Sequence, residues 1–240
     1  MENRNPFKRM ILTLGSPYGT LLLVLVVILL VYPFLGSHGA VSWVFDFIML
    51  AAVVSAVRVT KGRGRVYYLI WALGLSAFIS SLLGRSLGIE SVYPVGAGLR
   101  ALFMGYLIVV IFSDTMRRRK VTFDAVLGAS CVYVLLGLTF GSVFALFEWV
   151  VPGSFSIPAA SQSTAGILGR PSTEFSLSYF SLIAMTTVGF GDIIPVAPLA
   201  RSMAALEGML GQLFVTIIIA RLVGLEIAGR MQEQGPRDEG

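Results

Sequence analysis

The hydrophobic positions of the chain fall into long, nearly unbroken runs separated by short polar connections. Six runs approach or exceed the roughly 20 apolar residues that a helix needs to cross a bilayer. They cover residues 19–36, 41–57, 66–84, 93–112, 124–148 and 199–220. None shows the strict alternation of a membrane β-barrel strand. The pattern therefore predicts an all-α integral membrane protein with six spanning helices.

A shorter apolar segment, residues 175–186, lies between the last two runs. At about a dozen residues it is too short to cross a bilayer, so a re-entrant helix is expected. Directly after it comes the irregular stretch Thr-Thr-Val-Gly-Phe-Gly-Asp at 186–192. Non-helical backbone at membrane depth is tolerated only where protein or water satisfies its polar groups.

Composition agrees with a membrane location. The 240 residues are 56% hydrophobic and 13% charged, and the mean hydropathy is +0.84. A soluble domain carries about a quarter charged residues. The net charge of +5 comes mainly from basic clusters beside the predicted spans, so it does not indicate nucleic-acid binding.

Basic residues gather before the first run, after the second and after the fourth. The clusters are Arg4, Lys8 and Arg9; Arg58, Lys61, Arg63 and Arg65; and Arg117, Arg118, Arg119 and Lys120. Because cytoplasmic loops carry an excess of Lys and Arg, this alternation predicts a multi-pass protein of the cell membrane with both termini in the cytoplasm. We expect the last cluster to anchor the chain beside anionic lipid.

The stretch 186–192 has the composition of a cation-coordinating backbone. If the chain is extended with successive carbonyls turned to one side, four copies form stacked oxygen rings that replace the hydration shell of K⁺. Such a backbone needs positive φ at alternate residues, which glycine adopts at no steric cost. The expected ligands are carbonyls of Thr187, Val188, Gly189 and Phe190, with the Thr187 hydroxyl in the innermost ring.

The preceding short helix fits the same interpretation. Ser172 or Thr173 can cap its start, and Glu174 lies where the positive end of the helix dipole favours an anion. The partially negative C-terminal end would then face the membrane centre, where it favours a cation. One loop per chain requires four chains to close the ring, which predicts a homotetramer.

These residues resemble the selectivity filter of potassium channels, in the variant with phenylalanine between the glycines. Tyr179 and Phe180 occupy the places of the paired pore-helix aromatics, and Gly211 falls at the spacing of the inner-helix hinge. The segment 220–225 is similar to the end of the inner helix in bacterial members. The resemblance covers about residues 124–228.

The resemblance implies a bacterial six-transmembrane layout and bound potassium ions. Residues 1–120 would form a four-helix sensor-like domain and 121–230 a two-helix pore domain with a re-entrant pore helix and selectivity filter. Residues 231–240 would be a disordered tail. The implied supporting residues of the filter are Thr186, Tyr179, Phe180, Gly191 and Asp192.

Three positions depart from the commoner family pattern. Phe190 lacks a phenol oxygen, and Ile183 stands where some bacterial members have glutamate. Phe180 lacks the indole N–H that would hold the carboxylate of Asp192. Each lost hydrogen bond is worth about 0.5–1.5 kcal/mol, so we expect a filter held mainly by packing and with unusual inactivation.

The fourth run contains a single basic residue, Arg100. A voltage sensor needs several charges in the field, at about 2.3 kcal/mol per charge per 100 mV. Arg100 is either a residual gating charge or a structural residue that snorkels or pairs with Asp46. In either case the sequence predicts weak or absent voltage gating.

Three polar residues of the pore region have open roles. Asp124 is expected to cap the fifth helix. Glu207 either supports the back of the pore helix, pairs with Arg201, or faces water near the outer end. Gln212, beside the expected hinge, is a candidate for lining the central cavity.

Two rival functions come from other classes. Gly189-Phe190-Gly191-Asp192 also matches the Gly-x-Gly-Asp motif of intramembrane aspartyl proteases. That chemistry needs a second carboxylate facing the first, and the only candidate is Asp46. A non-conducting channel subunit is the other alternative. The paired threonines have no role in the protease, so the sequence favours a channel and not an enzyme.

Overall fold

The computed structural model describes residues 16–35, 64–86, 93–118, 122–158 and 171–234. Its helices are α2 (Pro17–Leu35), α4 (Gly64–Ser86), α5 (Tyr93–Arg117), α6 (Phe123–Val150), α8 (Pro171–Met185) and α9 (Pro198–Gln234). Two short strands, β1 (Phe155–Ser156) and β2 (Ile194–Pro195), pair antiparallel. The expected second span at 41–57, with Asp46, lies outside the described residues.

Within the described ranges, three helices are long and apolar enough to cross a membrane: Pro94–Arg117, Phe123–Val150 and Pro198–Gly229. Two shorter apolar helices, Pro17–Val27 and Tyr68–Ser80, accompany them. The described fold is therefore helical apart from the small two-stranded β1–β2 sheet, and it has the elements of a membrane protein. The complete six-span layout stays a prediction.

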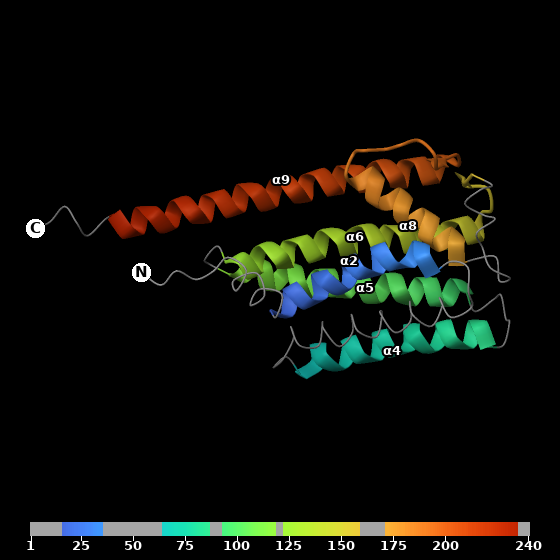
Figure 1. Ribbon diagram of the computed structural model, residues 1–240, viewed down its shortest axis with the longest axis horizontal. Coiled ribbons are helices and arrows are strands. Elements are labelled where there is room, and N and C mark those ends of the chain that lie inside the picture. The colour runs from blue at the N-terminus through green and yellow to red at the C-terminus, as the bar shows by residue number, and fades with distance from the viewer. Residues whose placement is uncertain (1–15, 36–63, 87–92, 119–121, 159–170, 235–240) are drawn as a thin grey trace, which may run out of the picture.

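The helices form a bundle with α9 along one edge (Figure 1). α4 packs on α5, α5 on α6, and α2 on α6. The short α8 slants across the bundle and packs against both α6 and α9. One end of α9 extends well past the other helices. As a result α6 touches α2, α5, α8 and α9 and is the central helix of the bundle.

One hydrophobic core joins the two halves of the chain. Its buried residues come from α2, α4, α5 and α6 and include Tyr18, Ile70, Leu107 and Val132. Phe214 of α9 packs against the same cluster. The core therefore contains residues from both sides of position 120, and the expected division into two domains stays a prediction.

A second hydrophobic core surrounds Leu177 and Phe180 of α8. Phe144, Phe155 and Phe180 form a triangle with ring centroids 5.2–5.7 Å apart. Aromatic pairs at such distances are favourable beyond the area that they bury. Leu177, Ile193 and Ala200 complete this cluster. It fixes α8, the β1–β2 sheet and the start of α9 relative to one another.

Glycines allow α6 and α8 to cross at close range. A Cβ atom on Gly141 would lie 2.5 Å from the Cα of Ser178, and one on Gly137 would lie 2.6 Å from Cδ2 of Leu182. A side chain at Gly141 would require movement of the α8 backbone, whereas one at Gly137 would require the Leu182 side chain to shift. The helix crossing thus sets where the end of α8 lies.

Several element boundaries differ from expectation. α8 begins at Pro171, where the fixed φ of proline suits a first helical position, so Ser172 and Thr173 lie inside the helix and are not its cap. The cap of α6 is Thr122, whose side chain accepts from the amide of Ala125, and not Asp124. α9 continues to Gln234 and includes the first residues of the expected tail.

Candidate functional site

The stretch after α8 has an alternating backbone. φ is +60° at Thr187, +50° at Gly189 and +79° at Gly191. Positive φ is uncommon outside glycine and is worst for β-branched residues, so Thr187 holds a strained conformation. The expectation of positive φ at alternate residues is confirmed, with threonine as an additional member.

Backbone amides of this stretch point back to α8. Thr187 N–H donates to the Ala184 carbonyl at 3.1 Å, and the N–H groups of Val188 and Gly189 donate to the Ile183 carbonyl at 3.1 and 3.3 Å. These bonds satisfy carbonyls that the end of a helix leaves free. Within the part of the chain that the structure describes, the carbonyls of residues 187–190 accept no hydrogen bond. Four acceptors are therefore available to a ligand.

In a single chain, the side chains of the stretch 186–192 are exposed. Val188 is 54% exposed and Phe190 is 70% exposed. A Cβ on Gly189 or Gly191 would meet no heavy atom within 4 Å. Backbone conformation, and not crowding, is therefore the reason for glycine at these two positions.

Two side chains hold the end of α8. The carbonyl of Met185 accepts from the hydroxyl of Tyr133 at 3.2 Å and from Nε2 of Gln212 at 3.1 Å. A Cβ on Gly211 would approach the same carbonyl to 3.1 Å. α9 passes Gly211 without interruption. The glycine allows close approach here, and its role as a gating hinge stays a prediction.

Tyr179, and not Phe180, faces the carboxylate that follows the glycines. Tyr179 interacts electrostatically with Asp192, while Phe180 is buried in the aromatic triangle. The two aromatics are adjacent on a helix and so point in different directions. Phe180 makes no polar contact with Asp192, as expected, but Tyr179 gives the stretch a polar support in addition to packing.

Arg100 is joined to α8. Its Nε and one terminal nitrogen donate to the two oxygens of Glu174 at 2.9 and 2.7 Å. The two side chains are only 10% and 14% exposed. Ser142 also donates to Glu174 at 3.4 Å. Glu174 is thus a structural partner of Arg100, while the expected pairing with Asp46 lies outside the described residues.

Glu207 supports the back of α8, the first of its three expected roles. It is fully buried and hydrogen-bonded to Ser181 of α8. Arg201 instead donates to the Pro195 carbonyl at 3.1 Å. The pairing of Glu207 with Arg201 and its exposure to water are therefore both wrong.

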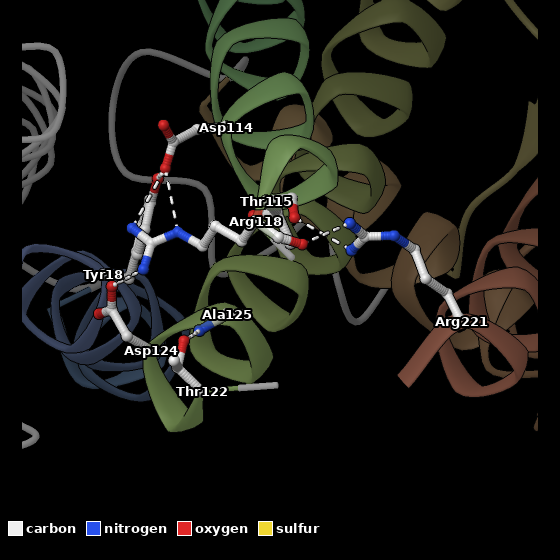
Figure 2. Close-up of polar contacts among 8 residues, drawn as sticks. All are labelled: Tyr18, Asp114, Thr115, Arg118, Thr122, Asp124, Ala125 and Arg221. Carbon is white, nitrogen blue, oxygen red and sulfur yellow. Dashed lines mark hydrogen bonds and ion pairs between the residues drawn. The ribbon is translucent and has the colours of Figure 1, made fainter. Parts of the chain in front are cut away.

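Polar side chains also fasten the α5–α6 corner, the residues around 114–125 where α5 returns into α6 (Figure 2). Arg118 pairs with Asp114 at 3.2 Å and with Asp124 at 2.9 Å. The hydroxyl of Tyr18 donates to Asp114 at 2.6 Å. Burial opposes the charge of Arg118, but the hydrogen bond to Asp114 and the two carboxylates raise its pKa.

Arg221 of α9 reaches the same corner from the other side (Figure 2). Its guanidinium donates to the carbonyls of Thr115, Met116 and Arg118 at 3.0, 2.6 and 2.9 Å. A cation at a helix C-terminus is favoured by the helix dipole. Arg221 thus connects α9 to the end of α5.

Of the basic cluster 117–120, the structure describes Arg117, which is exposed, and Arg118. Because Arg118 is held by carboxylates, only Arg117 of these two is open to a lipid headgroup. Arg119 and Lys120 lie outside the described residues. Contact with anionic lipid stays a prediction.

Sequence analysis missed three residues that hold the site. Tyr133 donates to the last carbonyl of α8, and Ser181, on the back of α8, contacts Glu207 of α9. Glu148 accepts from the amides of Gly153 and Phe155 at 2.8 and 2.9 Å, beside the β1–β2 strand pair. The available signal was a polar side chain inside an apolar run, which usually faces the protein interior. That signal indicates that the residue faces the protein interior, but it does not identify the partner.

Comparison with known families supports an ion channel. Residues 132–225 match a protein-family model described as "Ion channel". The match covers less than half of the chain, from the middle of α6 to near the end of α9, and it contains the whole stretch 186–192. Searches of curated proteins and of solved structures found no match. The matched helices and their apolar character indicate transport across a membrane and favour a channel over an enzyme.

Proposed function

We propose that the chain is a passive, potassium-selective ion channel of the cell membrane. Carbonyls of Thr187, Val188, Gly189 and Phe190 would coordinate K⁺, and Gly191 with Asp192 would close the stretch. The potassium selectivity in this proposal rests on the resemblance of these residues to potassium-channel filters. The match to an ion-channel family supports the broader class.

The hydrogen bonds of the stretch carry the proposal. The amides of Thr187, Val188 and Gly189 donate to the end of α8, whereas the carbonyls of residues 187–190 accept nothing within the described chain. A backbone carbonyl that is taken out of water needs another partner. Rings of such carbonyls substitute for the hydration shell of K⁺. The strained φ of Thr187 is also typical of a functional segment.

Four copies around an axis would complete the pore. In one chain Val188, Phe190 and much of α9 are exposed, including Leu206, Met209 and Leu213 at 52%, 62% and 53%. One chain supplies one set of carbonyls, and a ring of four requires four chains. Neighbouring copies would cover Phe190 and the open face of α9, with lipid covering the remainder.

The proposed channel has weak or absent voltage gating. Arg100 is the only basic residue between Tyr93 and Asp114, and both oxygens of Glu174 bind it. A guanidinium held by two hydrogen bonds to the pore-helix start does not move alone across the field. One charge per subunit would in any case give a shallow response.

A matched pair of glycine variants tests ion binding. Thermal unfolding of the purified protein in K⁺ is expected to occur at a higher temperature than in Na⁺ of equal concentration, because a ligand of the folded state stabilises it. Gly189→Ala should abolish the difference. Gly153→Ala is the control: both glycines have positive φ and open space around the missing Cβ, so both lose stability but only Gly189 lies in the proposed site.

Equal unfolding temperatures of the wild type in K⁺ and Na⁺ would contradict the proposal. A higher unfolding temperature in K⁺ than in Na⁺, together with no current in bilayer recording, would favour the non-conducting subunit. If the chain were a protease, Asp192→Asn would abolish proteolysis, whereas a channel with this change should still bind K⁺. The candidate second carboxylate of a protease, Asp46, lies outside the described residues.

A further inference from the structure

A row of buried, hydrogen-bonded groups connects α6, α8 and α9. Ser181 of α8 and Glu207 of α9 are both fully buried, at 0% exposure. The Oγ of Ser181 lies 2.6 Å from the carbonyl oxygen of Gly137 in α6 and also contacts Oε1 of Glu207. The other carboxyl oxygen of Glu207, Oε2, is buried without a hydrogen-bond partner.

Counting hydrogens determines the direction of these bonds. A serine hydroxyl has one hydrogen, and a backbone carbonyl can only accept. If that hydrogen goes to Glu207, the short contact between Ser181 and Gly137 joins two lone-pair oxygens and is repulsive. If it goes to Gly137, the contact with Glu207 needs a hydrogen from Glu207. Both contacts are hydrogen bonds only when Glu207 carries a proton.

The unpartnered Oε2 of Glu207 also indicates that the carboxyl group is protonated. A buried carboxylate needs a cation or several donors, whereas a neutral carboxylic acid leaves only a carbonyl oxygen unpaired. Within the described residues no Lys, Arg or His forms an ion pair with Glu207. The anion would thus be both uncompensated and under-bonded, while the acid is nearly satisfied.

Ionisable groups on the surrounding helices do not change this balance. The described ones are Asp124, Cys131, Tyr133 and Glu148 on α6, Glu174 and Tyr179 on α8, and Arg201, Arg221 and Glu226 on α9. Of these only Tyr133 interacts electrostatically with Glu207, and a phenol supplies no positive charge. The cations among them are used elsewhere: Arg201 by the Pro195 carbonyl and Arg221 by the end of α5.

We propose that Glu207 is a resident proton site, a neutral carboxylic acid that donates to Ser181, which in turn donates to the Gly137 carbonyl. The relay joins α9, α8 and α6 about one helical turn from Gly211. It makes Glu207 a positioning residue for the end of α8 without placing a net negative charge behind the pore. The inference concerns the proton alone and holds whichever ion the pore conducts.

Infrared spectroscopy of the purified protein at pH 7 tests the proposal. The C=O stretch of a protonated carboxylic acid lies apart from the bands of carboxylates and amides. We expect this band in the wild type and its loss in Glu207→Gln, whose amide replaces the acid as donor to Ser181. Glu226→Gln is the matched control, since it makes the same change at an exposed position of the same helix, and it should keep the band.

Absence of the band from the wild type, or its survival in Glu207→Gln, would overturn the proposal. Wild-type protein labelled with ¹³C-glutamate needs no folded variant at position 207. In that sample the band must move to lower frequency if it belongs to glutamate. An unmoved band would assign the proton to an aspartate and refute the inference. The infrared result is expected to be the same whether or not the protein conducts K⁺, so the two proposals can fail separately.

Discussion

At the scale of single residues, the ion pair between Arg100 and Glu174 allows a test of whether Arg100 is a gating charge or a structural residue. The guanidinium makes two parallel hydrogen bonds to the carboxylate. Lysine carries the same charge but lacks the planar fork. A substitution that keeps the charge and removes the geometry therefore distinguishes the two roles.

We expect both Arg100→Lys and Arg100→Gln to destabilise the protein, the latter by about 3 kcal/mol, because each leaves Glu174 incompletely paired in a buried position. Neither should change the steepness of any current–voltage relation. Thermal unfolding and bilayer recording measure the two effects. A gating charge would differ in the Gln variant: Lys would preserve the steepness and Gln would reduce it.

The residue scale also shows what a sequence can predict at a site. The stretch 186–192 was identified because its backbone needs are local: alternate positive φ requires glycine wherever the stretch folds. The partner of Arg100 was not identified, because Glu174 lies 74 positions away in the sequence and an intramembrane charge indicates only that a partner exists. For the same reason the three roles of Glu207 could not be ranked until the position of Ser181 was known.

At the scale of elements, the α6–α8 crossing determines where the end of α8 lies. Gly141→Ala should destabilise the protein by about 2 kcal/mol through overpacking, because its Cβ meets the backbone of Ser178 at 2.5 Å. Gly98→Ala in α5 meets nothing within 4 Å and should stabilise by about 0.5–1 kcal/mol through helix propensity. Thermal unfolding of the two variants checks the difference, and similar effects of the two would show that the crossing is not tight.

The contact of α9 with the α5–α6 corner gives a second prediction at this scale. Arg221→Gln should lower stability by about 1.5 kcal/mol, because three carbonyls at the end of α5 lose a charged donor. Arg201→Gln makes the same change on the same helix at an exposed site with one bond and should cost about 0.5 kcal/mol. Equal losses in thermal unfolding would mean that Arg221 does not fasten α9 to α5.

Boundaries and caps were the least predictable features of the elements. Hydrophobic runs located every described helix, but α5, α8 and α9 extend beyond their runs because polar residues at the ends can also be helical. Thr122 and Asp124 are both good capping residues, and only the local backbone shows which one precedes the first turn. Asp124 instead lies inside the helix and pairs with Arg118.

At the scale of the whole molecule, the packing of α5 on α6 brings together residues from both sides of the expected domain boundary. The core that contains Tyr18, Leu107 and Val132 spans residues on both sides of position 120. Periodicity could not show this, because it describes each helix separately and carries no information about its neighbours. The exposed faces of α9 and the stretch 186–192 remain open in one chain, which is why the proposed pore needs further copies.

Planar-bilayer recording with KCl on one side and NaCl on the other tests the central claim most directly. The account predicts a reversal potential far from zero, with the sign set by K⁺ moving out of the KCl side, and a conductance that depends little on voltage. Current that reverses near zero would show a channel without potassium selectivity and would contradict the proposed role of residues 187–190.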